Sequence, residues 1–373
     1  MSQHDPANSL LPSLPAGSRL LIIRLRSIGD IVLLTPALRL LKQWRPDLRT
    51  SVLVDSRFRD LLDANPDIEE VIGLEKAAGY RRLAAEWQTI RKLRRKRFSV
   101  CLNLHGGPTS TTLMAASGAQ WKAGFWHFRL QRLYNILVPD ARKILNQSSI
   151  HTAEHQACAL FWLGLPQTEI PAARLEVCEE DSRWWSTQRD AAGIPAGQPY
   201  AVVHPTALYP TKQWAPEHFA KAGSFLEREA GLKVIYSAGP GESSVLDAVE
   251  RACGQHIRRL GNASLGKFAA AMAEARLFLG NDSGPAHMAA ALGRPSVVVF
   301  GSSSSSIWGP WPPADPARPS HVVQNSYECN PCPGDRCYRY DRPECILSIT
   351  YEQVRDALQA VLRDSLEHFG SRC

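Results

Sequence analysis

Short continuous apolar runs recur along this chain, and each is followed by a polar turn and then by apolar residues spaced three or four apart. Such runs are typical of buried strands in a parallel sheet, and the spacing that follows them predicts helices. The first half should contain strands at 19–25, 50–55, 71–74 and 99–104, and helices at 31–42, 57–62, 81–97 and 151–163. The second half should contain strands at 200–204, 232–237 and 295–300, with a further strand that begins at Leu277. Its helices should lie at 216–230, 242–252, 264–275 and 350–369, with a further helix that starts at the turn 281–287.

This alternation over 373 residues predicts an α/β protein with more than one domain, because a single core rarely grows so large. We expect two Rossmann-like domains facing across a central cleft, where a ligand would bind. Prolines bracket the stretch between them and indicate a linker. The expected boundaries are a flexible N-terminus at 1–18, a first domain at 19–165, a linker at 166–176, a second domain at 177–349 and a closing helix at 350–373.

The turn Asn281-Asp-Ser-Gly-Pro-Ala-His287 stands between a predicted strand and a predicted helix. Amides at a helix start and the hydroxyl of Ser283 can bind an anion, and Gly284 allows a close approach to the main chain. His287 lies four positions after Ser283 and should project from the same side of the helix. Asp and Ser are also ordinary helix caps, so the turn alone leaves anion binding and capping both open.

Polar residues also follow three other predicted strands. Ligands of open parallel sheets bind at the edge formed by the carboxyl ends of the strands, where these residues should lie. Gly29 and Asp30 follow the first strand. Lys212 lies in a hydroxyl-rich loop after strand 200–204, where it is either a phosphate contact or an exposed lysine. Glu242 follows the next strand, as a ribose contact or a helix cap. None of these turns carries the G-x-G-x-x-G pattern of dinucleotide-binding folds.

The formal net charge of +7 is local, because 81–97 alone carries eight Lys or Arg and one Glu. The segment is either a solvated helix face or a surface for anionic lipid, with Arg91–Arg97 facing the membrane. We do not expect nucleic acid as a partner, since only Trp87 and Phe98 could stack on bases and no recognisable binding module surrounds them.

Hydrophobic content of 44% and charged content of 21% indicate a soluble globular protein. The chain has no apolar run long enough to span a bilayer, and Met1–Ser18 lacks the features of a secretion signal. Nine cysteines in such a chain indicate reduced thiols in the cytoplasm. Four of them, Cys329, Cys332, Cys337 and Cys345, have a spacing compatible with zinc or an iron–sulfur cluster, but also with reduced structural thiols.

Taken in order, five motifs resemble the ADP-heptose:lipopolysaccharide heptosyltransferases, glycosyltransferases of the GT-B fold. The resemblance extends from Arg19 to Leu362. The motifs are Ser27-Ile-Gly-Asp30, His204-Pro-Thr206 with Lys212-x-Trp214, Asn281 to His287, Pro295 to Gly301, and Trp308-Gly-Pro310.

The resemblance implies that the first domain binds a lipid A-linked core oligosaccharide acceptor and the second binds ADP-heptose. Asp30 would be the general base, Lys212 would assist catalysis at the diphosphate, and no metal or other cofactor would be needed. The residues implied at the donor are Thr206, Glu242, Asp282, Ser283, Gly284 and His287. Those implied at the acceptor are Gly29, Arg57 and Arg59.

The expected protein is therefore an inverting heptosyltransferase on the cytoplasmic face of the inner membrane. One alternative is the same scaffold with another nucleotide-sugar donor or glycolipid acceptor. A non-catalytic protein that binds anionic lipid or nucleic acid would explain the basic segment, but it leaves Asp30 and the 281–287 turn without a purpose.

Overall fold

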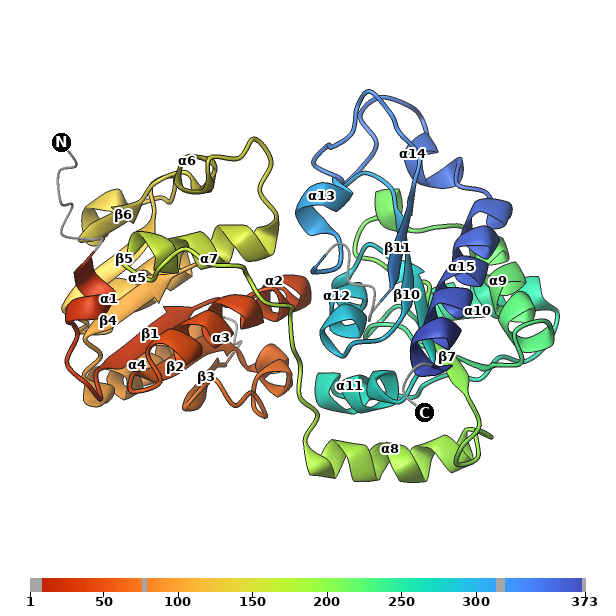
Figure 1. Ribbon diagram of the computed structural model, residues 1–373, viewed down its shortest axis with the longest axis horizontal. Helices are drawn as coiled ribbons and strands as arrows, with labels where there is room; N and C mark the ends of the chain where they lie inside the picture. The colour runs from red at the N-terminus through yellow and green to blue at the C-terminus, as the bar shows by residue number, and fades with distance from the viewer. Residues whose placement is uncertain (1–8, 76–78, 313–318, 371–373) are drawn as a thin grey trace. The chain divides into compact units, whose positions relative to one another are not determined.

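The computed structural model describes residues 9–75, 79–312 and 319–370. The chain forms two compact units that divide between Glu176 and Val177, called unit 1 and unit 2 below. Each unit is a parallel sheet with helices on both faces (Figure 1), so the predicted α/β class with two Rossmann-like sheets is confirmed.

Unit 1 contains a six-stranded sheet in the order β3-β2-β1-β4-β5-β6, with every pairing parallel. Its strands are β1 (Arg19–Ile23), β2 (Arg49–Asp55), β3 (Glu70–Leu74), β4 (Val100–Asn103), β5 (Trp121–Phe125) and β6 (Ile136–Val138). Its helices are α1 (Leu10–Ser13), α2 (Ile28–Val32), α3 (Thr35–Trp44), η2 (Ser56–Leu61), α4 (Tyr80–Lys96), α5 (Pro108–Ala116), η3 (Gln131–Leu133), α6 (Ala141–Leu145) and α7 (Thr152–Trp162). The central strands are buried on both faces, which explains their unbroken apolar runs.

The helix predicted at 31–42 is two helices, α2 and α3, and Pro36 is the reason. A proline has no amide hydrogen to donate to the carbonyl four residues earlier, which here belongs to Val32. The Thr35 hydroxyl donates to that carbonyl instead, at 2.8 Å. The break makes α2 a separate short helix that carries Asp30 in its first turn.

The N-terminal segment differs from the flexible 1–18 that we expected. Residues 1–8 lie outside the described part of the chain. Beyond them, α1 packs on the unit: Leu11 is fully buried, and its amide donates to the carbonyl of Leu163 at 2.9 Å. Burial of two leucines thus orders a stretch whose polar and proline-rich composition indicates a loop.

Unit 2 contains a five-stranded parallel sheet in the order β11-β10-β9-β7-β8. Its strands are β7 (Tyr200–His204), β8 (Lys233–Tyr236), β9 (Leu277–Asn281), β10 (Ser296–Phe300) and β11 (Ser320–Gln324). Its helices are α8 (Glu179–Ala191), η4 (Pro210–Lys212), α9 (Pro216–Arg228), α10 (Ser243–Cys253), α11 (Leu265–Ala273), α12 (Gly284–Ala291), α13 (Ser305–Trp308), α14 (Glu344–Leu347) and α15 (Tyr351–Gly370). The closing helix predicted at 350–373 is α15, and residues 371–373 are outside the described chain.

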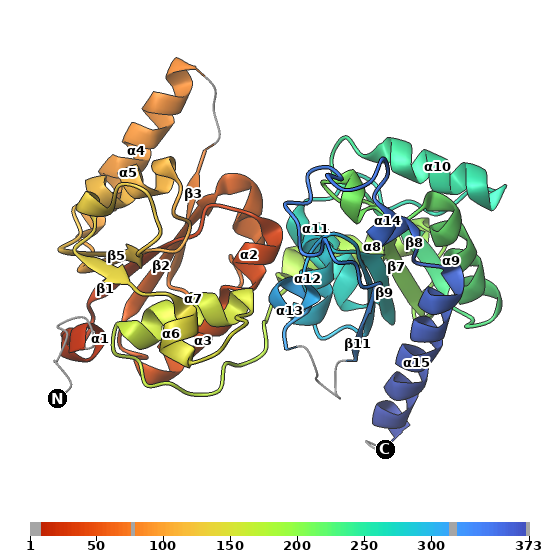
Figure 2. The same cartoon turned by 90° about the horizontal axis from the view of Figure 1, so that it is seen from above.

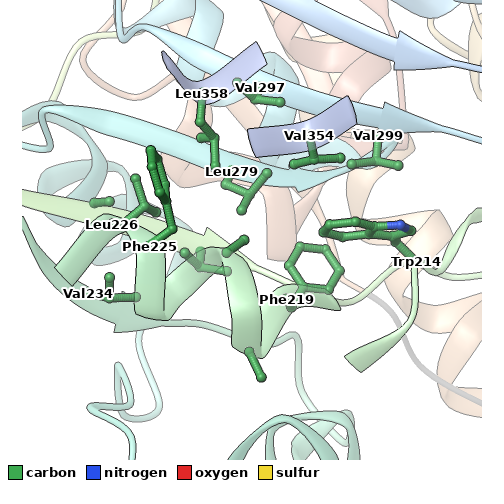
Figure 3. Close-up of a cluster of buried hydrophobic side chains, with 14 of the residues drawn as sticks. Trp214, Phe219, Phe225, Leu226, Val234, Leu279, Val297, Val299, Val354 and Leu358 are labelled. Carbon is green, nitrogen blue, oxygen red and sulfur yellow. The ribbon is translucent and has the colours of Figure 1, made fainter. Parts of the chain in front are cut away.

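Apolar side chains of α9, α10 and α15 meet those of the strands in a single cluster on one face of this sheet. Figure 3 shows the side chains that α9 and α15 contribute beside those of β8, β9 and β10. Trp214 lies in this cluster and is 1% exposed, and its indole nitrogen donates to the carbonyl of Ile349 at 2.8 Å. Because Trp214 follows Lys212 by two residues, the core anchors the loop that presents Lys212.

Within the described residues, we find no helix that combines the length and the hydropathy required to cross a membrane.

Candidate functional site

The candidate donor residues all follow strands of unit 2 at the carboxyl edge of the sheet. Lys212 belongs to the loop after β7, Glu242 to the loop after β8, and Asp282 to the loop after β9. Since β9 lies between β7 and β10, and β8 lies beside β7, these loops meet at one edge, as the sequence predicts.

Lys212 and Asp282 form an ion pair, with 2.7 Å between Nζ and Oδ2. The carboxylate side chain is 5% exposed, whereas the lysine side chain is 21% exposed. The buried carboxylate therefore fixes the position of the ammonium group, and the ammonium keeps access to solvent. A cation held in this way can neutralise a phosphate without a metal ion.

Asn281 connects the loop that carries Lys212 to β9. Its side chain is fully buried, accepts a hydrogen bond from the amide of Trp214 at 3.1 Å and donates to the carbonyl of Pro205 at 2.9 Å. A single amide group thus holds both ends of the loop from Pro205 to Trp214.

The helix start at Ser283 and Gly284 is partly exposed. The Ser283 hydroxyl donates back to the carbonyl of Asn281, at 3.3 Å, rather than accepting from the first amides of α12. This geometry departs from an ordinary serine cap and favours the interpretation of the turn as an anion site. His287, by contrast, is 5% exposed and lies within α12 behind the turn.

A chain of hydrogen bonds between buried side chains stabilises the loops at the same edge of the sheet. The ring of His204 bonds to the hydroxyl of Ser237 at Nδ1 and to that of Thr206 at Nε2, both at 2.9 Å. Burial lowers the pKa of His204 to about 4, so the imidazole is neutral at physiological pH. Thr206 is fully buried as well, which makes it a support of the loop rather than part of its exposed surface.

Glu242 is partly exposed at the end of the loop after β8. Its Oε2 accepts a hydrogen bond from the amide of Gly239 at 2.9 Å, so the side chain closes its own turn. The carboxylate retains a second oxygen, and a role as a turn cap is compatible with one as a hydroxyl acceptor.

Asp30 occupies the corresponding edge of unit 1, in the first turn of α2 after β1. Its Oδ2 accepts from the amide and hydroxyl of Ser27 at 3.0 and 3.1 Å, and its Oδ1 pairs with the guanidinium of Arg24. The side chains of Asp30 and Arg24 are 16% and 13% exposed, respectively. The carboxylate is therefore fixed in orientation but still accessible.

Two histidines near Asp30 were not predicted from the sequence. His105 follows β4 and interacts electrostatically with Arg24, Arg26 and Asp30; burial, followed by the two arginines, lowers its pKa to about 4. His155, on α7, interacts with the same Arg24 and Asp30, and burial lowers its pKa to about 4. The signal that could have indicated His105 is its place directly after an apolar strand, the same place that singled out Asp30.

His155 is held by an aromatic contact with the end of β5. Its ring stacks on Phe125 with 3.9 Å between ring centroids, and His127 stacks on the same ring at 5.7 Å. The edge near Asp30 therefore carries two imidazoles that are neutral at physiological pH, those of His105 and His155, and the buried ring of Phe125 holds His155 in place.

Two of the predicted acceptor contacts, Arg57 and Arg59, lie on η2, which packs against the helix α2 that carries Asp30, and each arginine has a partner within unit 1. Arg57 forms two hydrogen bonds with Asp55, at 2.9 and 2.6 Å, and Arg59 contacts Asp63 at 2.9 Å. Both arginine side chains are about half exposed, at 53% and 52%. Gly29 is buried in α2, so any acceptor contact there would require local opening.

The four clustered cysteines line a cavity of about 40 Å³ behind the Lys212 loop, and all four are free thiols. No group of three or more His, Cys, Asp or Glu side chains within the described residues is arranged to hold a metal ion. Thr211 donates to the carbonyl of Gly334, and Ser302 donates to Thr211 at 3.2 Å. The cysteine-rich segment therefore braces the turn that carries Lys212.

Comparison with known proteins gives consistent results. The family profile "Glycosyltransferase family 9 (heptosyltransferase)" matches residues 86–339, more than half of the chain. Lipopolysaccharide heptosyltransferase 3 of Escherichia coli K12 is 26% identical, over 77% of this chain and 83% of that protein. Lipopolysaccharide heptosyltransferase 2 of the same strain is 23% identical, over 92% of this chain and 98% of that protein.

Solved structures show the same fold. A glycosyltransferase family 9 structure from Veillonella parvula has a TM-score of 0.79 at 23% identity and covers 93% of this chain and 98% of its own. The E. coli ADP-heptose heptosyltransferase II structure has a TM-score of 0.74 at 20% identity, with coverages of 92% and 98%. An E. coli heptosyltransferase solved with ADP has a TM-score of 0.68 at 19% identity, with coverages of 92% and 99%.

Proposed function

The chain belongs to glycosyltransferase family 9, and from that premise we propose that it transfers heptose from ADP-heptose to the lipopolysaccharide inner core, with inversion at the anomeric carbon. The observation that carries the donor half is the Lys212–Asp282 pair beside the start of α12. The names of the relatives, which are lipopolysaccharide heptosyltransferases, support the choice of sugar and acceptor.

We assign the donor diphosphate to unit 2. The Lys212 ammonium, Ser283 and the amides near Gly284 neutralise the charge that grows on the diphosphate as the bond to the sugar breaks. Asp282 holds Lys212, while His204 and Thr206 hold the loop from beneath. Glu242 accepts a hydrogen bond from a ribose hydroxyl, and His287 supports α12 from within.

We assign the acceptor and the proton transfer to unit 1. Asp30 accepts the proton of the attacking acceptor hydroxyl as the new bond forms between that oxygen and the anomeric carbon. The electron pair of the broken bond leaves with ADP. Arg24 and Ser27 orient the carboxylate. Arg57 and Arg59, on η2, which packs against α2, contact acceptor phosphates, whereas Gly29, buried in α2, reaches the acceptor only if α2 opens locally. The reaction needs no metal in this scheme, because Lys212 and helix amides neutralise the leaving group.

The acceptor is attached to lipid A, so we place the enzyme on the cytoplasmic face of the inner membrane, where ADP-heptose is available. Another ADP-sugar or another glycolipid would be handled by the same residues, which recognise the diphosphate and a hydroxyl rather than the whole sugar.

Two measurements test this proposal. Saturating ADP or ADP-heptose should raise the melting temperature, since a ligand at about 100 times its Kd adds about 2.7 kcal/mol to stability. UDP is the control and should produce a smaller shift. Incubation with ADP-heptose and heptose-deficient core acceptor should then add one heptose to the acceptor, detected by mass spectrometry. An unchanged melting temperature with every adenine nucleotide would contradict the donor assignment, and transfer from another ADP-sugar alone would revise only the sugar.

A further inference from the structure

Helix α4 has two differently used sides. Thr89 and Leu93 are buried against unit 1, and Lys92 and Lys96 both pair with Glu70 at the start of β3, Lys92 at 3.3 Å. Two of the cations of the basic segment are thus occupied by an internal carboxylate. The segment 91–97 does not act as a uniform positive surface.

The opposite side of α4 combines apolar and basic residues. Leu83 and Trp87 are 65% and 58% exposed, large values for such side chains, and Arg91 and Arg95 are exposed as well. These four residues follow one another at intervals of four positions, so they form a single row along the helix, called the α4 stripe below. In Figure 2 the N-terminal part of α4, which carries Leu83 and Trp87, projects beyond the other elements of unit 1.

The stripe is ordered by a contact between its members. The guanidinium carbon of Arg91 lies 4.8 Å from the centre of the Trp87 ring. The contact places the charged group of Arg91 against one face of the indole ring. The apolar surface of Trp87 and Leu83 therefore lies next to a fixed positive charge. Tryptophan and arginine together suit the boundary between lipid headgroups and acyl chains.

We propose that the α4 stripe docks on an anionic phospholipid surface, with Leu83 and Trp87 entering the headgroup boundary and Arg91 and Arg95 binding lipid phosphates. Charge complementarity supports this occupant, because the formal charge of +7 of the whole chain equals that of segment 81–97. The inference rests on the proposed function in one respect: a lipid-linked acceptor brings the enzyme to such a surface.

A second exposed segment, after β5, carries Trp126 and Leu130, which are 49% and 55% exposed. Its neighbours His127 and Phe128 pack together at 4.8 Å, next to the ring of Phe125 that also stacks on His155. This segment therefore borders the edge of unit 1 that carries Asp30. Among the contacts described above, none connects the α4 stripe to the residues around Asp30. We therefore assign the membrane contact to the α4 stripe and leave the segment after β5 to the candidate site.

Co-sedimentation with vesicles tests the charged half of the stripe. The full-length protein is mixed with vesicles of phosphatidylethanolamine and phosphatidylglycerol, without donor or acceptor, at low salt. Arg91→Gln with Arg95→Gln should lower the partition coefficient about 30-fold, from about 1 kcal/mol for each cation near the surface. Lys92→Gln with Lys96→Gln is the matched control, with the same loss of charge on the side that faces Glu70, and should lower it by less than about threefold.

Tryptophan quenching by brominated lipid tests the apolar half. Wild-type fluorescence should fall when brominated vesicles are added, and Trp87→Phe should abolish that fall while retaining binding. Trp126→Phe is the control and should be quenched like the wild type. Leu83→Ser with Trp87→Ser should weaken binding without changing the circular dichroism spectrum, since both side chains are exposed.

Equal losses in the two charge variants, or quenching that disappears with Trp126→Phe instead of Trp87→Phe, would overturn the assignment to the stripe. Binding to RNA that depends on Arg91 and Arg95, without any to vesicles, would replace lipid by nucleic acid. Because the vesicles contain no sugar acceptor, these results are independent of heptose transfer, which ADP-induced stabilisation and the transfer assay report separately.

Discussion

Both units place a carboxylate beside a cation at a turn from strand to helix, but they differ in how deeply the carboxylate is buried. In unit 1 the carboxylate of Asp30 is 16% exposed and its partner Arg24 is 13% exposed. In unit 2 the carboxylate of Asp282 is 5% exposed and Lys212 is 21% exposed. The acid is thus about as accessible as its cation in unit 1, whereas in unit 2 the cation is clearly the more accessible member.

The choice of cation fits this difference. The guanidinium of Arg24 reaches both Asp30 and the carbonyl of Leu104, so it ties the acid to the end of β4 in a planar arrangement. The ammonium of Lys212 is a compact charge on a flexible stem, which can contact a phosphate while Asp282 holds it. The same chemical pair can therefore orient an accessible acid or present a cation, depending on how deeply the acid is buried.

The largest effect should come from Asp30→Asn. An amide can still accept hydrogen bonds from Ser27, so the turn keeps its shape, but it cannot accept the proton. Turnover should fall about 10²–10⁴-fold. The melting-temperature shift produced by ADP should stay near that of the wild type, because unit 2 is unchanged. Turnover at the wild-type level would remove Asp30 from the mechanism.

Lys212→Gln should be next, with turnover reduced about 10²–10³-fold. This variant, unlike Asp30→Asn, should also reduce the stabilisation by ADP, because the lost cation faces the diphosphate. Lys221→Gln, which removes an exposed lysine on α9, is the control and should match the wild type in both assays. If the Asp30 and Lys212 variants had the same pattern in the two assays, the division of roles between the units would be wrong.

Lowering the pH should decrease the free energy of unfolding through protonation of His204, whose neutral ring bonds to Ser237 and Thr206. Its pKa is about 4 when folded and about 6.5 when unfolded, so the unfolded state binds the proton first as pH falls. The stabilising contribution of the neutral ring is present above about pH 6.5 and is lost between there and about pH 4, by up to about 3 kcal/mol.

Urea unfolding between pH 7 and pH 4.5 measures this loss. His204→Asn keeps a polar group between Ser237 and Thr206 without the titration, and its free energy of unfolding should depend less on pH. Parallel curves for the two proteins would show that His204 does not cause the acid sensitivity. His105 and His155 remain in both proteins, so the difference isolates the histidine of unit 2.

The smallest effect expected is that of Gly301→Ala. A Cβ atom at this position would lie 2.3 Å from the carbonyl oxygen of Thr211, so the turn that carries Lys212 must shift. We expect a loss of about 1–3 kcal/mol in stability, as for other overpacked sites, and weaker ADP binding. Gly261→Ala adds a Cβ with open space around it and is the control. Equal ADP affinity in both variants would show that the close approach of Gly301 to Thr211 does not determine the position of Lys212.

Local patterns predicted most of the central strands, because these are buried on both faces and therefore apolar throughout. The three-residue strand β6 is too short to carry a periodic signal. The strand β5 contains Trp121, Lys122 and Gly124, and its place in the sheet is determined by pairing with β4 rather than by composition. Likewise, the break between α2 and α3 depends on one missing amide, that of Pro36.

The candidate site was predicted as a set of loops, but not as a set of contacts. Asp30, Lys212 and Asp282 each follow an apolar strand, which a sequence shows directly. Their partners come from distant positions: Gln156 donates to the carbonyl of Asp30, 126 residues away, at 3.0 Å. Burial likewise separates Ser283, which is accessible, from Thr206, which is not, although both are hydroxyl residues in adjacent loops. Only tertiary packing determines these differences.

The buried amide of Asn281 has a thermodynamic consequence for ligand binding. Since it holds Pro205 and Trp214 at the two ends of one loop, most of the backbone entropy of that loop is lost during folding rather than on association. A nucleotide then meets a rigid receptor, and its affinity is not reduced by the ordering of the segment. Between the two ends, Thr206 and Thr211 are buried supports, so sequence variation that leaves Lys212 in place is confined to exposed positions of the loop such as Leu208.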